Sequence, residues 1–266
     1  MEKLDFYLIL IFVCINLNFI TNGQETEQPI VEKQELQSER TAQLANLLGR
    51  CRLRSETFNS CMKNVFNDLR IFFPTGIPEY NIKPFDPHKC SFVQARRGDR
   101  NGFGGFILIL RNVSEYGWTN SKVTKFRMNE DQNKFVYSQY FPDKGLDGYF
   151  EFNGKMFGRS MKNYGVWNLS LSDYSQTTTI RRLGGPGSIL KVNVVVDRIG
   201  GMELHISNFF GRERDGLNNF ADTVINSMWQ LGLPFIKPLI NELVSTAFTD
   251  IFNESFRYFP VQDFMT

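Results

Sequence analysis

Residues 216–252 read GLNNFADTVINSMWQLGLPFIKPLINELVSTAFTDIF, and their apolar side chains recur at helical spacing on both sides of a short interruption. Gly232 and Pro234 form that interruption, and Pro234 and Pro238 fit the opening turn of the second half, where a missing backbone N–H costs little. A continuous helix would extend over about 50 Å at 1.5 Å per residue, whereas a compact domain of this size is about 45 Å across. The segment therefore predicts a helix that crosses an elongated molecule, with a sheet wrapped around it.

The region before this helix, from about Phe92 to Ser207, shows the two-residue period of β-strands. In VWNLSLSD, for example, Trp167, Leu169 and Leu171 alternate with polar residues, so one face of the strand is apolar and the other is wet. The pair Asn153-Gly154 lies between two strand-like segments and predicts a hairpin turn. The pattern as a whole predicts a meander of antiparallel strands with one covered face.

A different kind of sequence precedes the strands. After Cys61, apolar residues at helical spacing predict a helix that ends at Pro74. The segment FFPTGIPEYNIKPFDPHKC, residues 72–90, then contains four of the chain's ten prolines. Proline fixes φ and lacks a backbone donor, so this segment is neither helix interior nor central strand. We expect a rigid apolar connector that leads to the first strand.

The first 23 residues have the layout of a secretory signal. Lys3 precedes an apolar run from Phe6 to Leu17, which is shorter than the ~20 residues of a membrane span. We expect cleavage near Gly23 and hence an extracellular, secreted protein, with a retained anchor as the alternative. Residues 24–36 are polar and are expected to be disordered or frayed, which leaves residues 37–266 as one domain.

Three cysteines remain after the leader is removed, namely Cys51, Cys61 and Cys90. Disulfides form in an oxidising compartment. Cys51 and Cys61 would lie about 15 Å apart on one straight helix, so a bond between them requires the chain to turn. The intervening SETFNS supplies residues that favour turns and helix caps. We favour a Cys51–Cys61 disulfide with Cys90 unpaired, and a Cys61–Cys90 bond is the alternative.

Charge and composition exclude several classes of partner. The net charge is +2, or +3 without the leader, which is too small to indicate nucleic acid or a charged membrane surface. We interpret the isolated pairs Arg96-Arg97 and Arg181-Arg182 as solvated edges. The two histidines, His88 and His205, show no metal-ligand spacing, so neither a metal nor another cofactor is expected. The 26 phenylalanines exceed what an ordinary core needs, which fits either an apolar cavity or a solid Phe-rich core.

Over nearly all of its mature length, the sequence resembles the insect takeout and juvenile-hormone-binding protein family. The features that carry the resemblance, in chain order, are the Cys51/Cys61 pair, GIPEYNIKPFDP, GYFEFNGKMFG followed by GVWNLSLSD, and NFFGRERDGLNNFADTVINSMWQLGLPFIKPLINEL. The resemblance implies an α+β fold in which a long C-terminal helix is wrapped by a highly curved antiparallel β-sheet, with an N-terminal helical cap. The chain departs from the family pattern at Cys90 and lacks the second disulfide of the dedicated hormone carriers.

The resemblance also implies an apolar tunnel between helix and sheet that holds a small hydrophobic ligand, such as a juvenile-hormone-like terpenoid, a fatty acid or another lipid. The proline-rich connector would run along the mouth of this tunnel, or would be a stiff loop over the core. The residues that we expect in the tunnel wall are Phe150, Phe152, Trp167, Leu169 and Leu171 from the sheet, Val224, Met228 and Trp229 from the helix, and Phe73 and Trp118 near one end.

Two other functions are alternatives to that of a carrier. A secreted hydrolase is disfavoured because the chain has neither a G-x-S-x-G elbow nor an H-E-x-x-H motif, so we expect no enzyme. A lipid-surface protein of the bactericidal/permeability-increasing type would need a basic patch, and we expect no stable membrane insertion. The N-x-S sequons at Asn112, Asn168 and Asn253 predict N-glycosylation. The sequence does not identify a receptor or another carrier partner.

Overall fold

The computed structural model describes the chain in segments. These are residues 30–98, 105–129, 133–156, 159–185, 187–208, 210 and 215–259. The chain divides into two compact units, residues 1–42 and 43–266. The expected leader and its cleavage site lie outside the described residues. Helix α2 (Ile30–Leu48) begins inside the polar segment 24–36, so residues 30–36 are helical where we expected disorder.

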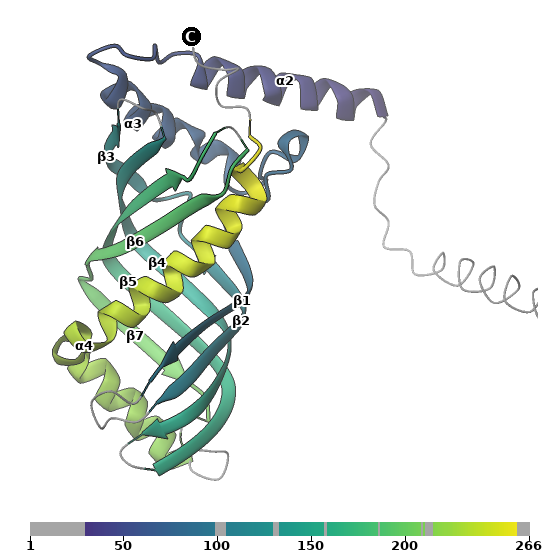
Figure 1. The fold of residues 1–266 in the computed structure, drawn as a ribbon. Coiled ribbons are helices and arrows are strands. Elements are labelled where there is room, and N and C mark those ends of the chain that lie inside the picture. Colours follow the sequence, from purple (N-terminus) through teal and green to yellow (C-terminus); the bar gives the residue numbers. More distant parts are fainter. Residues whose placement is uncertain are drawn as a thin grey trace, which may run out of the picture. The chain divides into compact units, whose positions relative to one another are not determined.

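The second unit contains the end of α2, three short helical elements, a sheet and one long helix (Figure 1). After α2, its elements are α3 (Phe58–Asp68), the 3₁₀ turns η1 (Leu69–Phe72) and η2 (Pro78–Tyr80), strands β1 (His88–Arg97), β2 (Phe106–Tyr116), β3 (Lys122–Met128), β4 (Lys134–Met156), β5 (Arg159–Arg182), β6 (Leu190–Arg198) and β7 (Gly201–Ile206), and helix α4 (Asp215–Phe256). The predicted α+β architecture is confirmed. Among the described residues, no helix is both long enough and apolar enough to cross a membrane.

The sheet is antiparallel throughout and has the order β1-β2-β4-β5-β6, with β3 pairing along β4 and β7 along β5. Strands β4 and β5 pair from Lys134–Arg181 at one end to Met156–Arg159 at the other. Strand β4 pairs with β3 up to Tyr140 and with β2 from Gly145, so its other edge changes neighbour between them. Pro142 lies in that gap, where its missing N–H breaks no pairing with β2 or β3.

The hairpin predicted at Asn153-Gly154 is wrong, because both residues lie inside β4 and the strand continues to Met156. Gly154 is opposite Phe106 of β2, and a Cβ on Gly154 would come within 2.3 Å of the Phe106 Cβ. A glycine is therefore required at position 154, because Phe106 approaches the backbone there too closely for a side chain. The Phe106 ring stacks on Phe152 at 5.5 Å.

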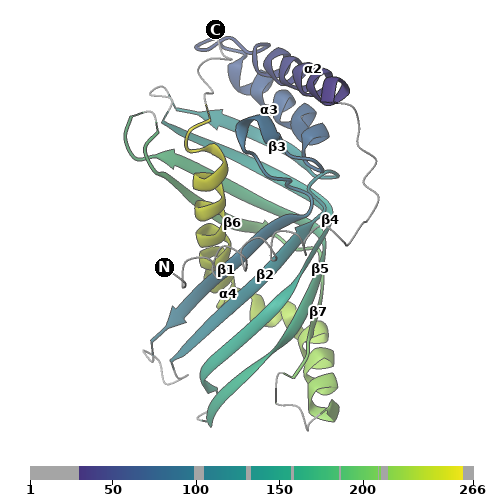
Figure 2. The ribbon, with the colours of Figure 1, turned by 90° about the vertical axis from the view of Figure 1, so that its right-hand side faces the viewer.

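Helix α4 is continuous through Pro234 and Pro238 and closes the curved sheet (Figure 2). It contacts β1 at one edge of the sheet and β6 and β7 at the other. An exposed strand edge presents unpaired N–H and C=O groups, and on the β6 and β7 side the helix provides partners for them.

Side chains of α4 do this with a regular series of hydrogen bonds, which we call the polar ladder. Every fourth residue of the helix accepts from the N–H of every second residue of β6, at 2.8–3.1 Å. The pairs are Asn241 with Val196, Ser245 with Val194, Thr249 with Val192 and Asn253 with Leu190. Four helical residues rise about 6.0 Å and two strand residues about 6.6 Å, so the two spacings nearly match.

The N-terminal half of α4 continues this arrangement on β7 and the residues after it. Asn226 both accepts from the N–H of Leu204 (2.8 Å) and donates to its carbonyl (3.0 Å). Asp222 accepts from the N–H of Ile206 at 3.2 Å, and Asn218 from that of Phe210 at 2.9 Å. In this half of the helix, the side turned toward the sheet is therefore polar.

Candidate functional site

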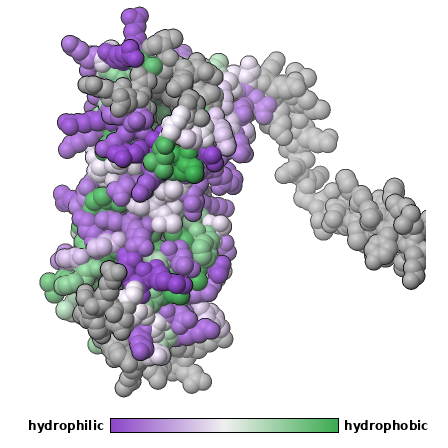
Figure 3. Space-filling model, viewed as in Figure 1, coloured by the Kyte–Doolittle hydropathy of each residue, from purple (hydrophilic) through white to green (hydrophobic). Residues whose placement is uncertain are grey.

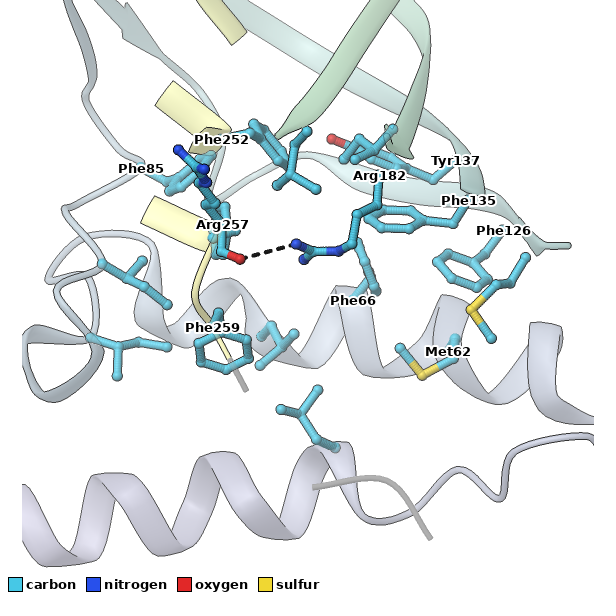
Figure 4. Close-up of a pocket in the computed structure, with 18 of the residues that line it drawn as sticks. Met62, Phe66, Phe85, Phe126, Phe135, Tyr137, Arg182, Phe252, Arg257 and Phe259 are labelled. Atoms are coloured by element: carbon cyan, nitrogen blue, oxygen red, sulfur yellow. Dashed lines mark hydrogen bonds between the residues drawn. The ribbon is translucent and has the colours of Figure 1, made fainter. Parts of the chain in front are cut away.

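The second unit encloses a cavity of about 790 Å³, within the range of roughly 300–1,000 Å³ that small-molecule sites occupy. Its wall comes from the end of α2, from α3, from the proline-rich connector, from β3, β4 and β5, and from the C-terminal end of α4. Aromatic rings make up much of the wall, as the close-up shows for Phe66, Phe126, Phe135 and Phe252 (Figure 4).

Helix α3 covers one side of the cavity because its apolar residues recur at helical spacing. Phe58, Met62 and Phe66 all line the wall, and the Phe66 ring lies 5.1 Å from that of Phe126 on β3. Asn67 joins the two elements, since its Oδ1 accepts from the N–H of Val123 (2.9 Å) and its Nδ2 donates to the carbonyl of the same residue (3.0 Å).

A disulfide between Cys51 and Cys61 ties the chain that follows α2 to α3, with a Cα–Cα distance of 5.7 Å. The chain turns between the two cysteines, so this prediction is confirmed and the alternative Cys61–Cys90 bond is wrong. Cys90 is a free thiol whose Sγ donates to the carbonyl of Phe92 at 3.4 Å. Burial raises the pKa of the Cys90 thiol.

The proline-rich connector forms another side of the wall. Ile77 and Ile82 pair as a short β-bridge, and both side chains are buried against the cavity. Gly76 makes this fold-back possible with a φ of +68°, where a Cβ would lie 2.3 Å from the Ile82 carbonyl oxygen. The carbonyl of Phe73 accepts from the N–H of Phe85 at 2.8 Å, which brings both rings into the wall.

The deep end of the cavity is formed by Trp118, which is 2% exposed, and by Tyr137 and Gln139. Burial raises the pKa of Tyr137 to about 12, so this phenol is neutral at physiological pH. The buried Trp118 Nε1 and Gln139 Oε1 have no hydrogen-bond partner within the described chain. Both atoms are covered by protein, so they do not face the open space of the cavity.

Behind Trp118 lies a buried ion pair between Lys144 and Glu115, which are 4% and 7% exposed. The Lys144 Nζ also lies over three rings, at 4.0 Å from Phe141, 4.8 Å from Tyr174 and 4.9 Å from Trp118. Burial would raise the pKa of Glu115, but attraction to Lys144 and the contact with His88 outweigh it and lower the pKa to about 2. Burial lowers the pKa of Lys144 despite the attraction to Glu115.

A second, smaller cavity of about 70 Å³ lies on the other side of this cluster. His88, Cys90 and Trp167 are in its wall. A layer of rings lies between the two cavities. His88 stacks on Phe85 at 4.7 Å and meets Trp118 edge-on at 5.6 Å, and both of these partners line the larger cavity.

Of the ten residues that we expected in the tunnel wall, some line a cavity and others do not. Phe73 and Trp118 line the large cavity, and Trp167 lines the small one. Seven others line neither cavity: Phe150, Phe152 and Leu171 are buried in the sheet, Leu169 and Trp229 are half-buried, and Val224 and Met228 are exposed. The helical residues face away because Asn218, Asp222 and Asn226 occupy the side of α4 toward the sheet.

Several wall residues were missed. The alternation of Phe135, Tyr137 and Gln139 along β4 was the available signal for one strand, and the four-residue spacing of Phe252 and Phe256 was the signal for the end of α4. Arg182, which we interpreted as part of a solvated edge, also lines the cavity. A single strand does not reveal which end of a long sheet will be capped by helices.

The sequon asparagines differ in their surroundings. Asn112 and Asn168 are exposed. Asn253 belongs to the polar ladder, and its Nδ2 donates to the carbonyls of Leu190 (2.7 Å) and Thr249 (2.6 Å). Asn112 and Asn168 therefore remain the better candidates for glycosylation.

Comparison with known proteins bears on the fold and the family. The crystal structure of Takeout 1 from Epiphyas postvittana is similar with a TM-score of 0.56 at 14% identity, over 80% of this chain and 97% of that one. A crystal structure of lipopolysaccharide binding protein reaches a TM-score of only 0.27 at 11% identity, over 82% of this chain and 38% of that one. No curated protein matches the sequence significantly. The model of the family described as haemolymph juvenile hormone binding protein (JHBP) matches residues 32–266, so the chain belongs to this family.

Proposed function

We propose that the protein is a secreted carrier that holds a small hydrophobic ligand, such as a juvenile-hormone-like terpenoid, a fatty acid or another lipid, in the large cavity. The observation that carries this proposal is the cavity of about 790 Å³ with its predominantly aromatic and aliphatic wall. Transfer of apolar ligand surface from water into such a wall contributes about 2.5 kcal/mol per 100 Å². The family description supports a hydrophobic ligand, and it and the Cys51–Cys61 disulfide support an extracellular location.

We infer that the carrier makes and breaks no bond in its ligand. The described residues of the cavity wall include no carboxylate, histidine, cysteine, serine or threonine. Lys83, Tyr137 and Tyr258 are its potential nucleophiles, and no carboxylate or histidine of the described wall is placed to act as their base.

The test compares the same substitution at two sites. Met62 lines the cavity, whereas Met228 is 52% exposed and lines neither cavity. Met62→Trp should fill space that the ligand occupies and weaken binding of a fluorescent fatty-acid or terpenoid probe at least tenfold, with a smaller loss of stability than in a solid core. Met228→Trp should change neither probe affinity nor melting temperature.

Probe displacement and thermal unfolding of both variants would be measured together. Equal probe affinity for wild type and folded Met62→Trp protein would contradict binding in this cavity. Loss of probe binding in Met228→Trp alone would move the site to the N-terminal half of α4.

One observation favours a second candidate function, association with a lipid surface. The N-terminal half of α4 exposes a stripe of apolar side chains at helical spacing, with Phe220, Met228, Leu231 and Phe235 exposed by 64%, 52%, 69% and 85%. Hydrophobic surface is visible at the lower left of Figure 3, where Figure 1 places α4. No charged residue occurs between Asp222 and Lys237, so charge would not oppose insertion of this stripe among lipid head groups. Flotation with neutral phosphatidylcholine vesicles should then be lost in Phe235→Asp protein and retained in Met62→Trp protein.

A further inference from the structure

The cavity wall carries positive charge without a matching negative charge. Lys83, Arg182 and Arg257 line it, and no carboxylate does so among the described residues. Lys83 forms an ion pair with Glu254, and both side chains are more than half exposed. Arg182 and Arg257 are half-buried, and no carboxylate of the described chain lies within ion-pair distance of either.

Backbone carbonyls hold both guanidinium groups in place. The Nη1 of Arg182 donates to the carbonyls of Ser188 and Arg257, each at 3.1 Å. The Nε of Arg257 donates to the carbonyl of Gly187 at 2.7 Å. Figure 4 shows Arg182 reaching from β5 toward the chain at the end of α4. The carbonyls of Gly187 and Ser188 are consecutive in the chain, so Arg257 and Arg182 are held by the same turn.

These bonds leave donors unused. A guanidinium has five N–H groups, and the Nε and Nη2 of Arg182 and both Nη atoms of Arg257 donate to no acceptor within the described chain. Two half-buried cations near one another repel, and an anion between them would remove that repulsion. The planar fork of arginine matches a carboxylate or a phosphate, which it binds with charge-assisted hydrogen bonds.

The location suits the head of an amphiphile. Gly184, Gly185 and Tyr258 line the same part of the wall and are exposed, so solvent reaches this end. Another part of the wall is the buried, aromatic deep end around Trp118. An elongated ligand therefore finds cations where water is accessible and aromatic rings where it is not.

From this arrangement we propose that Arg182 and Arg257 form a head-group site, and that the ligand is a single-chain amphiphile with an anionic head, a carboxylate or a phosphate. Its tail lies in the cavity toward Trp118. The proposal rests on the proposed carrier function and narrows its ligand class from hydrophobic molecules in general to anionic ones.

The test compares ligands that share a tail and differ in the head. Palmitate, methyl palmitate and palmitoyl lysophosphatidic acid would be titrated against the full mature protein by displacement of an uncharged fluorescent probe. Wild type should bind at least one of the two anions ten- to a hundredfold more tightly than the methyl ester, as expected for hydrogen bonds to charged groups. The tighter of the two anions assigns the head group as carboxylate or phosphate.

Arginine variants then locate the effect. Arg182→Met should lower affinity for the preferred anion at least tenfold more than affinity for methyl palmitate, and so remove the preference. Arg181→Met is the matched control, since Arg181 precedes it on β5, is exposed and does not line the cavity, and it should keep the preference. Arg257→Met gives a second reading of the same site if Arg182→Met does not fold.

Each other outcome is decisive. Equal wild-type affinities for the anions and the ester would overturn the head-group site and leave the carrier intact. An equal loss of affinity for ester and anions in Arg182→Met would also overturn it, because Arg182 would then only shape the cavity. Failure of all three ligands and of the probe to bind would instead refute the carrier function itself.

Discussion

Lys144, which lies behind the wall of the aromatic cavity, and the pair Arg182 and Arg257, which lines it, differ in how the fold compensates their charge. Lys144 lies behind Trp118, almost wholly buried, with the Glu115 carboxylate and three rings around it. Arg182 and Arg257 lie at the solvent-accessible end and are held by backbone carbonyls, with no carboxylate of the described chain as a partner. A buried charge that has its own counterion belongs to the folding energetics, whereas a charge without one is available to a ligand. The comparison predicts that stability depends on the first group and ligand selectivity on the second.

The largest expected effect is on the buried pair. Glu115→Gln leaves the Lys144 ammonium buried without a carboxylate, which typically costs about 3–5 kcal/mol. Urea unfolding should show this loss, and the double variant Glu115→Gln with Lys144→Met should recover most of it because no unpaired charge remains. A single variant as stable as wild type would mean that water or another group compensates Lys144, and the comparison would fail.

The contribution of Glu115 to stability should also appear in the pH dependence of unfolding of the wild-type protein. The pKa of Glu115 is lowered from an ordinary 4.5 to about 2, so its ionised form stabilises the fold fully above about pH 4.5. As the pH falls toward 2 that contribution is lost. Stability measured between pH 5 and pH 2 should fall more steeply for wild type than for the double variant. Parallel curves would show that other carboxylates dominate.

The smallest effect is expected at the open end. Arg182→Met removes two hydrogen bonds to carbonyls, each with a net contribution of roughly 0.5–1.5 kcal/mol, and it relieves repulsion with Arg257. Urea unfolding should therefore show a loss well below that of Glu115→Gln. A loss as large as that of the buried pair would make Arg182 a structural residue and remove the contrast between the two groups.

The architecture could be predicted from the sequence because the spacing of apolar residues alone distinguishes strands from helices. The two-residue alternation in β5 and the helical spacing of residues 216–252 predicted the sheet and the long helix. The hairpin at Asn153-Gly154 failed for a tertiary reason, since Gly154 serves its neighbour Phe106 on β2. A local turn motif such as Asn-Gly cannot reveal that its glycine is needed for a contact with another strand.

Prediction of the wall was less complete because spacing does not show which face of an element packs inward. The apolar face with Val224 and Met228 was expected to line the tunnel, but amides and carboxylates on the opposite face bind β7 and turn it outward. The four-residue spacing of Asn218, Asp222 and Asn226 was visible in the sequence, and recognising it as a backbone-binding pattern would have reversed the orientation. Arg182 was not identifiable as a wall residue, because its role depends on the turn at 187–188.

The polar ladder also restricts how the chain can change in length. Each rung joins four residues of α4 to two residues of β6, so helix and strand must be lengthened or shortened together in that ratio. Deleting one residue between Asn241 and Asn253 would rotate the rest of the helix by about 100° and remove every later rung at once. Sequence length in this part of the protein is therefore fixed by the backbone of a neighbouring strand, and tolerated insertions are expected in the loops rather than in α4.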